Sequence, residues 1–89
     1  MLTVTESAKQ LLKRTLSAHT DDPEISLRLS LKAPGQLGMV LDREAEGDQV
    51  VEHGGTKVLL VGHELLPIVE GLTLDVKDAA DGPKLVIYG

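Results

Sequence analysis

A chain of 89 residues is long enough for one domain with a modest core and too short for two domains. Its net charge of −5 at pH 7 argues against binding to nucleic acid or to an anionic membrane, because such binding needs clustered Lys and Arg. The sequence has no cysteine, which excludes disulfides, thiolate metal ligands and cysteine nucleophiles from these residues.

The first residues do not have the pattern of a targeting signal. They lack the basic and apolar regions of a signal peptide. No later run approaches the roughly 18 apolar residues of a membrane-spanning helix. We therefore expect a cytoplasmic protein without a membrane partner.

An amphipathic helix is predicted from Glu6 to Ala18. Its apolar residues recur at helical spacing and its basic residues fall on the other face. Thr5 is a good N-cap candidate, although Thr3 and Glu6 also fit a capping box, and the segment Asp21-Asp22-Pro23 ends the helix. The apolar face is expected to pack on a strand that presents Leu27 and Leu29. The helical residues that should meet this strand are Leu11, Leu12 and Leu16.

Two strands are predicted next. Ile25 to Leu31 alternates apolar and polar residues without a break, which is typical of a strand with one buried face. Lys32 to Gly35 contains a Pro-Gly turn signal, and Leu37 to Arg43 can form the second strand. Glu44 to Asp48 is polar and is predicted to be a solvated loop without chemistry.

A hairpin and a short helix are expected in the second half. Gln49 to Glu52 and Thr56 to Val61 flank a Gly-Gly pair, which supplies the positive φ values of a tight turn. His63 to Val69 is rich in aliphatic residues, but Pro67 limits a helix there to a turn or two.

The chain is expected to finish with two strands, Leu72 to Val76 and Lys84 to Tyr88. A polar loop from Lys77 to Pro83 should separate them. The order of helix, strands, short helix and strands predicts a strand-dominated α+β fold.

This order resembles the HesB-like family of A-type iron–sulfur carriers over nearly the whole chain. The opening Leu2 to Ala8 is similar to the family's short strand and capped first helix, and Leu27-Arg28-Leu29 to its first long strand. Val58 to Val76, with the pair Leu74-Asp75, is similar to its strand, short helix and following strand. At Gly35 to Met39 the family usually has Gly-Cys-Ser-Gly.

The resemblance implies one HesB-like domain over residues 1–89, with the first helix packed on a compact mixed sheet or barrel. It also implies that Gln36 stands at a cluster-ligating cysteine position, beside Gly35, Leu37 and Gly38. The family's Cys-Gly-Cys tail has no counterpart in this sequence. Gly47 to Glu52 resembles a cysteine-free branch whose members commonly have no assigned role. We therefore expect neither a cluster nor another cofactor.

His19, His53 and His63 are the candidate nitrogen ligands for a metal, together with the acidic residues near them. No pair has the i, i+4 spacing that would place two imidazoles on one helix face, so a shared site is not expected. His63 and Glu64 are neighbours in sequence, and their side chains are expected to point in different directions.

The sequence contains no nucleophile with an orienting base, no paired carboxylates and no phosphate-binding glycine loop at a recognisable spacing. Four acidic residues alternate near the middle of the chain. They lack the glycine and distal Glu of a calcium loop, and we expect them to be solvated. These residues are Asp42, Glu44, Glu46 and Asp48.

The sequence therefore favours a non-enzymatic interaction module with an unidentified protein partner, which it contacts through a loop from Ala33 to Met39. Self-association remains open. The alternatives are a cysteine-independent protein that handles iron or another metal in iron–sulfur cluster assembly, and a small enzyme with an unrecognised site.

Overall fold

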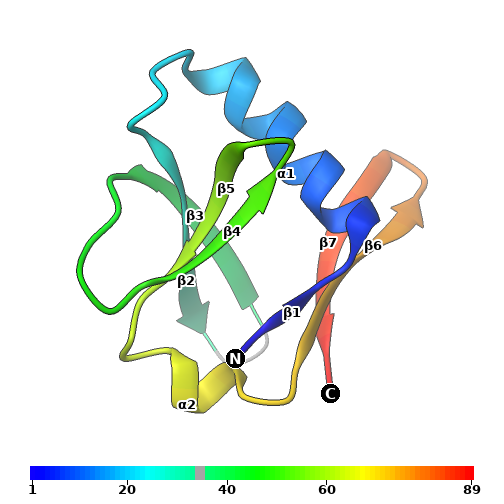
Figure 1. Cartoon of the computed structure of the whole chain (residues 1–89). Helices are drawn as coiled ribbons and strands as arrows, with labels where there is room; N and C mark the ends of the chain where they lie inside the picture. The colour runs from blue at the N-terminus through cyan, green and yellow to red at the C-terminus, as the bar shows by residue number, and fades with distance from the viewer. Residues whose placement is uncertain (34–35) are drawn as a thin grey trace.

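The structure is a computed structural model that describes residues 1–33 and 36–89. Within these residues there are two sheets and two helices (Figure 1). The larger sheet consists of β2 (Ser26–Ala33), β3 (Gln36–Asp42), β4 (Gln49–His53) and β5 (Thr56–Val61), in the order β3-β2-β5-β4. The smaller sheet consists of β1 (Thr3–Val4), β6 (Thr73–Ala79) and β7 (Gly82–Tyr88), in the order β1-β6-β7. The helices are α1 (Glu6–His19) and α2 (Leu66–Val69).

The helix α1 confirms the prediction from apolar spacing and ends one residue later. Thr5 is the N-cap, and its Oγ1 accepts a hydrogen bond from the backbone N–H of Ala8 at 3.2 Å. Leu12 and Leu16 are buried, whereas Leu11, at the flank of the apolar stripe, is only partly buried. The helix contacts both sheets, so its apolar face closes the space between them.

One apolar core is shared by α1 and the two sheets. Leu27, Leu59 and Val51 pair across β2, β5 and β4, so their side chains point to the same side of the sheet. Leu29 follows on this face and is 2% exposed, and Leu74 of β6 is fully buried from the opposite sheet. Each such side chain contributes about 1.5–3 kcal/mol relative to an exposed one. The strand-dominated α+β prediction is confirmed.

The loop predicted from Lys77 to Pro83 is wrong, because most of it is strand. β6 and β7 pair in antiparallel register as far as Ala79 opposite Gly82. Gly82 has φ of 116°, which a side chain at this tight turn would disfavour. Polar residues can form this extension because the paired backbones satisfy each other's hydrogen bonds, and the side chains stay in solvent.

The hairpin turn predicted at Gly54-Gly55 and the short helix predicted at Pro67 are confirmed, whereas the predicted Pro-Gly turn at Pro34 and Gly35 lies outside the described residues. Gly54 and Gly55 have φ of 58° and 81° at the turn between β4 and β5. Pro67 lies in the first turn of α2, where its missing N–H has no helical acceptor to lose. Neither helix in the described part of the chain has the length or apolar stretch that a bilayer crossing requires.

Two side chains connect the N-terminal segment to the sheets. The amide of Gln49 accepts from the Leu2 N–H at 2.9 Å and donates to the Leu2 carbonyl at 2.8 Å, which ties the strand segment before α1 to β4. The Thr5 hydroxyl donates to Asp75 Oδ1 at 2.7 Å. Asp75 therefore holds the N-cap of α1 against β6, a role for the Leu-Asp pair that spacing alone does not reveal.

Candidate functional site

The segment at the expected cluster position is largely strand and not the loop that the sequence suggested. Gln36 is the first residue of β3 and pairs with Ala33, and Leu37 pairs with Leu31. Gly38 pairs with Ser30. Gly35 lies outside the described residues. The ladder extends this far because the backbone pairing of a hairpin does not depend on which side chains are apolar.

The aliphatic chain of Lys32 lies over Gly38. A Cβ on this glycine would approach Lys32 Cε within 2.6 Å. A larger residue at position 38 would therefore displace this lysine. That Gln36 stands at the position of a cluster-ligating cysteine stays a prediction.

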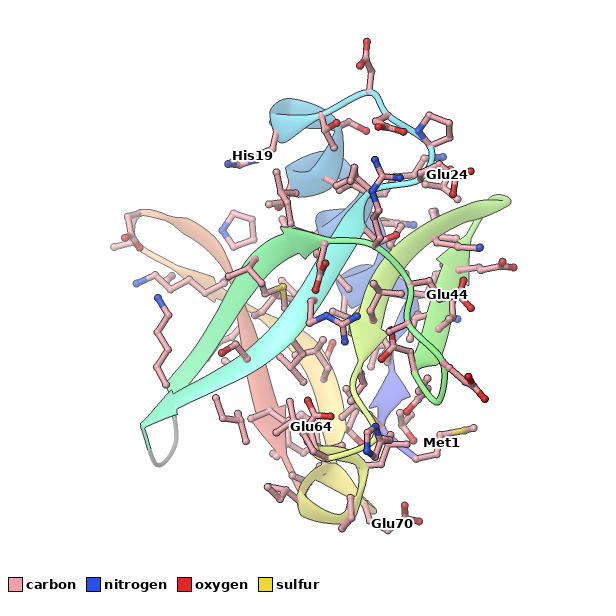
Figure 2. All side chains as sticks on the ribbon, turned by 90° about the vertical axis from the view of Figure 1, so that its left-hand side faces the viewer. Met1, His19, Glu24, Glu44, Glu64 and Glu70 are labelled. Carbon is pink, nitrogen blue, oxygen red and sulfur yellow. The ribbon has the colours of Figure 1, made fainter. Side chains whose placement is uncertain are left out.

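The three histidines lie in separate places. His19 Nδ1 is 2.8 Å from the Thr15 carbonyl at the end of α1, and His53 Nδ1 is 2.9 Å from Glu6 Oε2. His19 and Glu64, the neighbour of His63, stand at opposite ends of the molecule (Figure 2). Among residues 1–33 and 36–89, no three His, Asp or Glu side chains are grouped closely enough to hold a metal ion.

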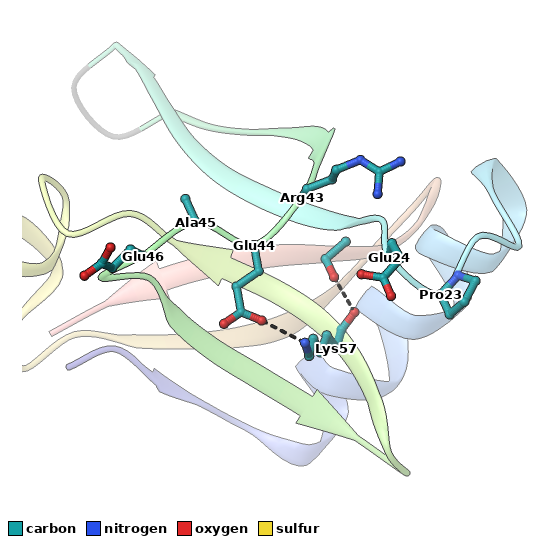
Figure 3. Close-up of a pocket in the computed structure, with 8 residues that line it drawn as sticks. Pro23, Glu24, Arg43, Glu44, Ala45, Glu46 and Lys57 are labelled. Carbon is teal, nitrogen blue, oxygen red and sulfur yellow. Dashed lines mark hydrogen bonds and ion pairs between the residues drawn. The ribbon is translucent and has the colours of Figure 1, made fainter.

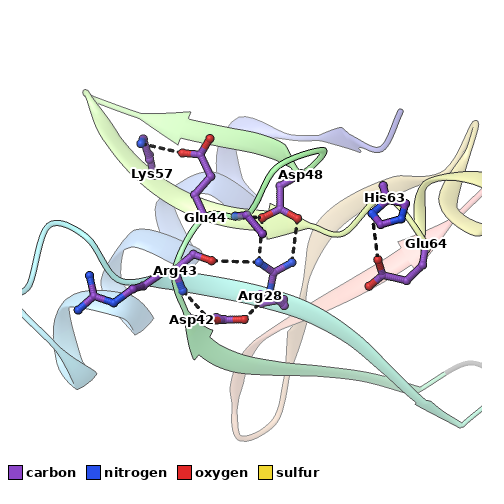
Figure 4. Close-up of polar contacts among 9 residues, drawn as sticks. Arg28, Asp42, Arg43, Glu44, Asp48, Lys57, His63 and Glu64 are labelled. Atoms are coloured by element: carbon purple, nitrogen blue, oxygen red, sulfur yellow. Dashed lines mark hydrogen bonds and ion pairs between the residues drawn. The ribbon is translucent and has the colours of Figure 1, made fainter.

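The expectation that His63 and Glu64 diverge is wrong. His63 Nδ1 lies 3.6 Å from Glu64 Oε2 (Figure 4). Both residues are in a turn, where the alternation of side chains along a strand does not apply. Both side chains are well exposed, so the pair contributes little to stability.

The principal polar cluster of the described chain is centred on Arg28 of β2 (Figure 4). Its Nη1 and Nη2 donate to the two Asp48 oxygens at 2.9 and 2.8 Å, a bidentate pair. Its Nε donates to Asp42 Oδ2 at 2.6 Å, and Nη2 also donates to the Arg43 carbonyl at 3.0 Å. We call Arg28, Asp42 and Asp48 the Arg28 network.

Asp48 corrects the prediction of a fully solvated acidic loop. Its side chain is only 3% exposed, and Oδ2 also accepts from the Ala45 N–H at 2.7 Å. The bond from Arg28 is the main cause that holds the pKa of Asp48 below its usual value. The pKa of Asp42 is also lowered, first by the Arg43 N–H and then by Arg28. Asp48 in turn raises the pKa of Arg28 above its usual value.

The Arg28 network lies on the side of the sheet opposite the main core. Arg28 pairs in register with Leu60, which is 0% exposed although it lies outside the core cluster. The face of the sheet that carries the network therefore also has a buried apolar residue. The sequence carries a signal for this: Val58 to Val61 is apolar without alternation, as in strands buried on both faces.

A hollow of about 390 Å³ opens beside the loop of residues 43–48, which connects β3 to β4 (Figure 3). Lys57 Nζ pairs with Glu44 Oε1 at 2.8 Å, and the hydroxyl of the buried residue Ser26 donates to the Lys57 carbonyl at 2.8 Å. Ser26 is thus engaged with the backbone and is not paired with a base, as a nucleophile would need to be. The other lining residues are Pro23, Glu24, Arg43, Ala45 and Glu46.

The outer edge of the larger sheet is formed by β3. Val40 and Leu41 on this strand are 49% and 44% exposed. Val40 pairs with Arg28 and Leu41 with Leu27, so the two side chains point to opposite faces of the sheet. The sequence predicts a strand over residues 37–43, but the position of this strand at an edge follows only from the strand order of the sheet.

Solved structures provide the comparison for this fold. Escherichia coli SufA, involved in biosynthesis of iron–sulfur clusters, aligns with a TM-score of 0.70 and 24% identity over 99% of this chain and 84% of SufA. A protein from Aquifex aeolicus aligns with a TM-score of 0.69 and 26% identity over 99% of this chain and 90% of that one. IscA with its [2Fe-2S] cluster aligns with a TM-score of 0.65 and 16% identity over 100% and 85%.

No protein-family model and no curated protein sequence matches the chain. The structural likeness covers almost every residue and includes proteins that share little sequence with this one. The resemblance found in the sequence is thereby confirmed at the level of the fold. The chain has the HesB-like fold of the A-type iron–sulfur carriers, in a sequence without cysteine.

Proposed function

We propose that this chain is a non-enzymatic interaction module on the A-type carrier scaffold, that it binds no iron–sulfur cluster, and that it contacts an extended segment of a protein partner along β3. The observation that carries the proposal is the exposed apolar pair Val40 and Leu41 on an edge strand. The fold itself supports a connection to iron–sulfur cluster biosynthesis, which is where SufA acts.

The absence of a cluster follows from ligand chemistry. Iron–sulfur clusters are held by cysteine thiolates, of which His replaces only some in Rieske centres. This sequence supplies no thiolate, and the carboxamide of Gln36 is a neutral, hard ligand. IscA carries a [2Fe-2S] cluster on the same fold, so the difference lies in the ligands and not in the architecture.

A strand at a sheet edge offers unpaired N–H and C=O groups to an added strand. The other long edge strands carry residues that discourage such pairing, Glu52 on β4 and Pro83 with Lys84 on β7. Between Gln36 and Leu41, β3 has neither a charge nor a proline. An added strand would cover the exposed apolar surface of Val40 and Leu41 on both faces.

The partner contact can be tested by quantitative affinity capture from the native cell extract. Val40→Lys/Leu41→Lys should lose a partner that the parent retains, because two charges would enter the interface. Ile68→Lys is the matched control, since Ile68 is an exposed apolar residue on α2 at 58%. Equal retention by both variants, or capture of this chain alone as a second copy, would contradict a partner segment along β3.

The missing cluster chemistry is tested separately. Anaerobic incubation with iron and sulfide should produce no charge-transfer absorption and no bound iron after desalting. A stable chromophore with stoichiometric iron would overturn this part of the proposal. Titration calorimetry with ferrous iron should show no binding tighter than about micromolar, and a tighter one-to-one isotherm would favour the metal-handling alternative.

A further inference from the structure

Charge is distributed unevenly between α1 and the rest of the molecule. The helix carries three of the nine Lys and Arg residues but only one of the 14 acidic residues, a net charge of +2. The remainder of the chain therefore carries −7 against the total of −5. The three helical cations are Lys9, Lys13 and Arg14.

These three side chains differ from most other cations of the protein. Arg28, Arg43, Lys57 and Lys84 each form an ion pair. None of the three helical cations forms one within the described residues (the pairs involve other side chains throughout). Their charges are therefore not neutralised inside the molecule and remain available to a ligand.

Lys13 and Arg14 stand at a groove between α1 and the turn of the β4–β5 hairpin, which lie side by side (Figure 1). A hollow of about 550 Å³ is lined there by Gln10, Lys13, Arg14, Ser17 and His53. Lys13 Nζ lies 3.4 Å from the place that a Cβ on Gly54 would take, so the amino group reaches across to the hairpin turn.

A second hollow of about 420 Å³ continues the groove and shares Lys13 and Ser17 with the first. Asp21 and Asp22 line this hollow together with Lys13 and Lys57, so its charges balance. The first hollow has Lys13 and Arg14 without an acidic residue. Glu6, the acidic residue of α1, is paired with His53. The groove thus has a polarity along the helix, with its uncompensated positive charge at Lys13 and Arg14.

We propose that the groove between α1 and the β4–β5 hairpin binds an acidic segment of a partner polypeptide, with carboxylates of the segment at Lys13 and Arg14. A nucleic acid fits less well, because its phosphate chain extends beyond these few cations. It would then meet the rest of the molecule, which carries a net charge of −7. This inference does not depend on the β3 contact proposed above.

The probe is a fluorescein-labelled octaglutamate peptide, measured by fluorescence anisotropy at low ionic strength. The parent protein should bind it saturably with Kd below about 1 mM, and the octaglutamine analogue should not bind. Lys13→Glu/Arg14→Glu should weaken binding at least about tenfold, since two attractive charges become repulsive. Added salt should weaken it as well.

The matched control is Lys32→Glu/Lys77→Glu. These two cations also lie outside the ion pairs of the described chain and outside both hollows, and either double variant lowers the net charge from −5 to −9. The control should change binding less than about threefold. Circular dichroism confirms folding, and the milder Lys13→Gln/Arg14→Gln variant replaces the charge reversal if it does not fold.

Amide chemical shifts supply the location. On peptide addition the parent should show changes at residues 9–17 and 53–55 and not at β3. Equal weakening by the two double variants, shifts elsewhere, stronger binding of an oligothymidylate of equal charge, or occupation of the groove by a second copy in sedimentation equilibrium would each overturn the proposal.

Discussion

Charged side chains are arranged in opposite ways on β2 and on α1. Arg28 on β2 is largely buried and makes four hydrogen bonds to two carboxylates and a carbonyl. Arg14 on α1 is exposed and forms no ion pair within the described chain. The type of a residue in the sequence therefore does not reveal whether its charge is paired inside the molecule. The arrangement of the folded chain decides this.

The paired charge on β2 and the unpaired charge on α1 also differ in free energy. A buried charge is tolerated only when its partner is also present, because desolvation costs several kcal/mol. An exposed charge loses little when it stands alone, and it can act at a distance on an approaching ligand. The following changes test this difference, beginning with the largest expected effect.

The largest effect is expected from a charge that is placed in the core without a partner. Leu29→Asp puts a carboxylate at a position that is 2% exposed, and it should unfold the domain, because the cost of about 3–5 kcal/mol or more approaches the total stability of about 5–15 kcal/mol. Circular dichroism melting measures this. Leu41→Asp on the same face is 44% exposed and is the control, and a cooperative Leu29→Asp melt equal to that of the parent would contradict the core assignment.

Removal of one partner from the Arg28 network should be the next largest change. Arg28→Met leaves Asp48 buried without a counter-charge, and we expect a loss of about 3 kcal/mol in the free energy of unfolding by urea titration. Arg14→Met should stay within about 0.5 kcal/mol of the parent. Similar losses in both variants would remove the distinction between the two regions.

Acid should weaken the protein through the same carboxylates. The folded-state pKa values of Asp48, Asp42 and Asp75 lie below their ordinary value of 3.8, mainly through Arg28 for the first, the Arg43 N–H for the second and the Thr5 hydroxyl for the third. Their contribution is therefore present above this ordinary pKa and is lost as the pH falls through the folded-state values.

The urea concentration at the unfolding midpoint should accordingly fall as the pH is lowered from 5 to 2. Arg28→Met should flatten this fall, because it removes the main interaction that lowers the pKa of Asp48. An equally steep fall in parent and variant would show that other groups govern the acid transition.

The smallest effect is expected at the surface pair of Lys57 and Glu44. Both side chains are 45% exposed, so Lys57→Ala should cost less than about 1 kcal/mol in spite of the 2.8 Å contact. A double-mutant cycle with Glu44→Ala measures the coupling directly. A coupling as large as that between Arg28 and Asp48 would show that exposure is not what separates these charges.

The sequence by itself determined the elements whose signals are local. The helical spacing of Leu12 and Leu16, the Thr5 cap and the turn at Gly54 and Gly55 each predict an element that the structure contains. The resemblance to A-type carriers predicted the fold, and a cysteine count needs no structure at all. The helix, its cap and the turn depend on residues within one turn or one strand of each other, and the cysteine count depends on composition alone.

Only the tertiary structure decided which charges are paired and which are free. Asp48 belongs to a polar loop, and its burial follows from Arg28, which lies 20 positions earlier in the chain. Lys13 lies close to the hairpin turn at Gly54, although the two residues are far apart in the sequence and belong to different elements. The edge position of Val40 likewise follows from strand order. Such features depend on contacts between distant segments, and the local patterns that form helices and turns carry no information about them.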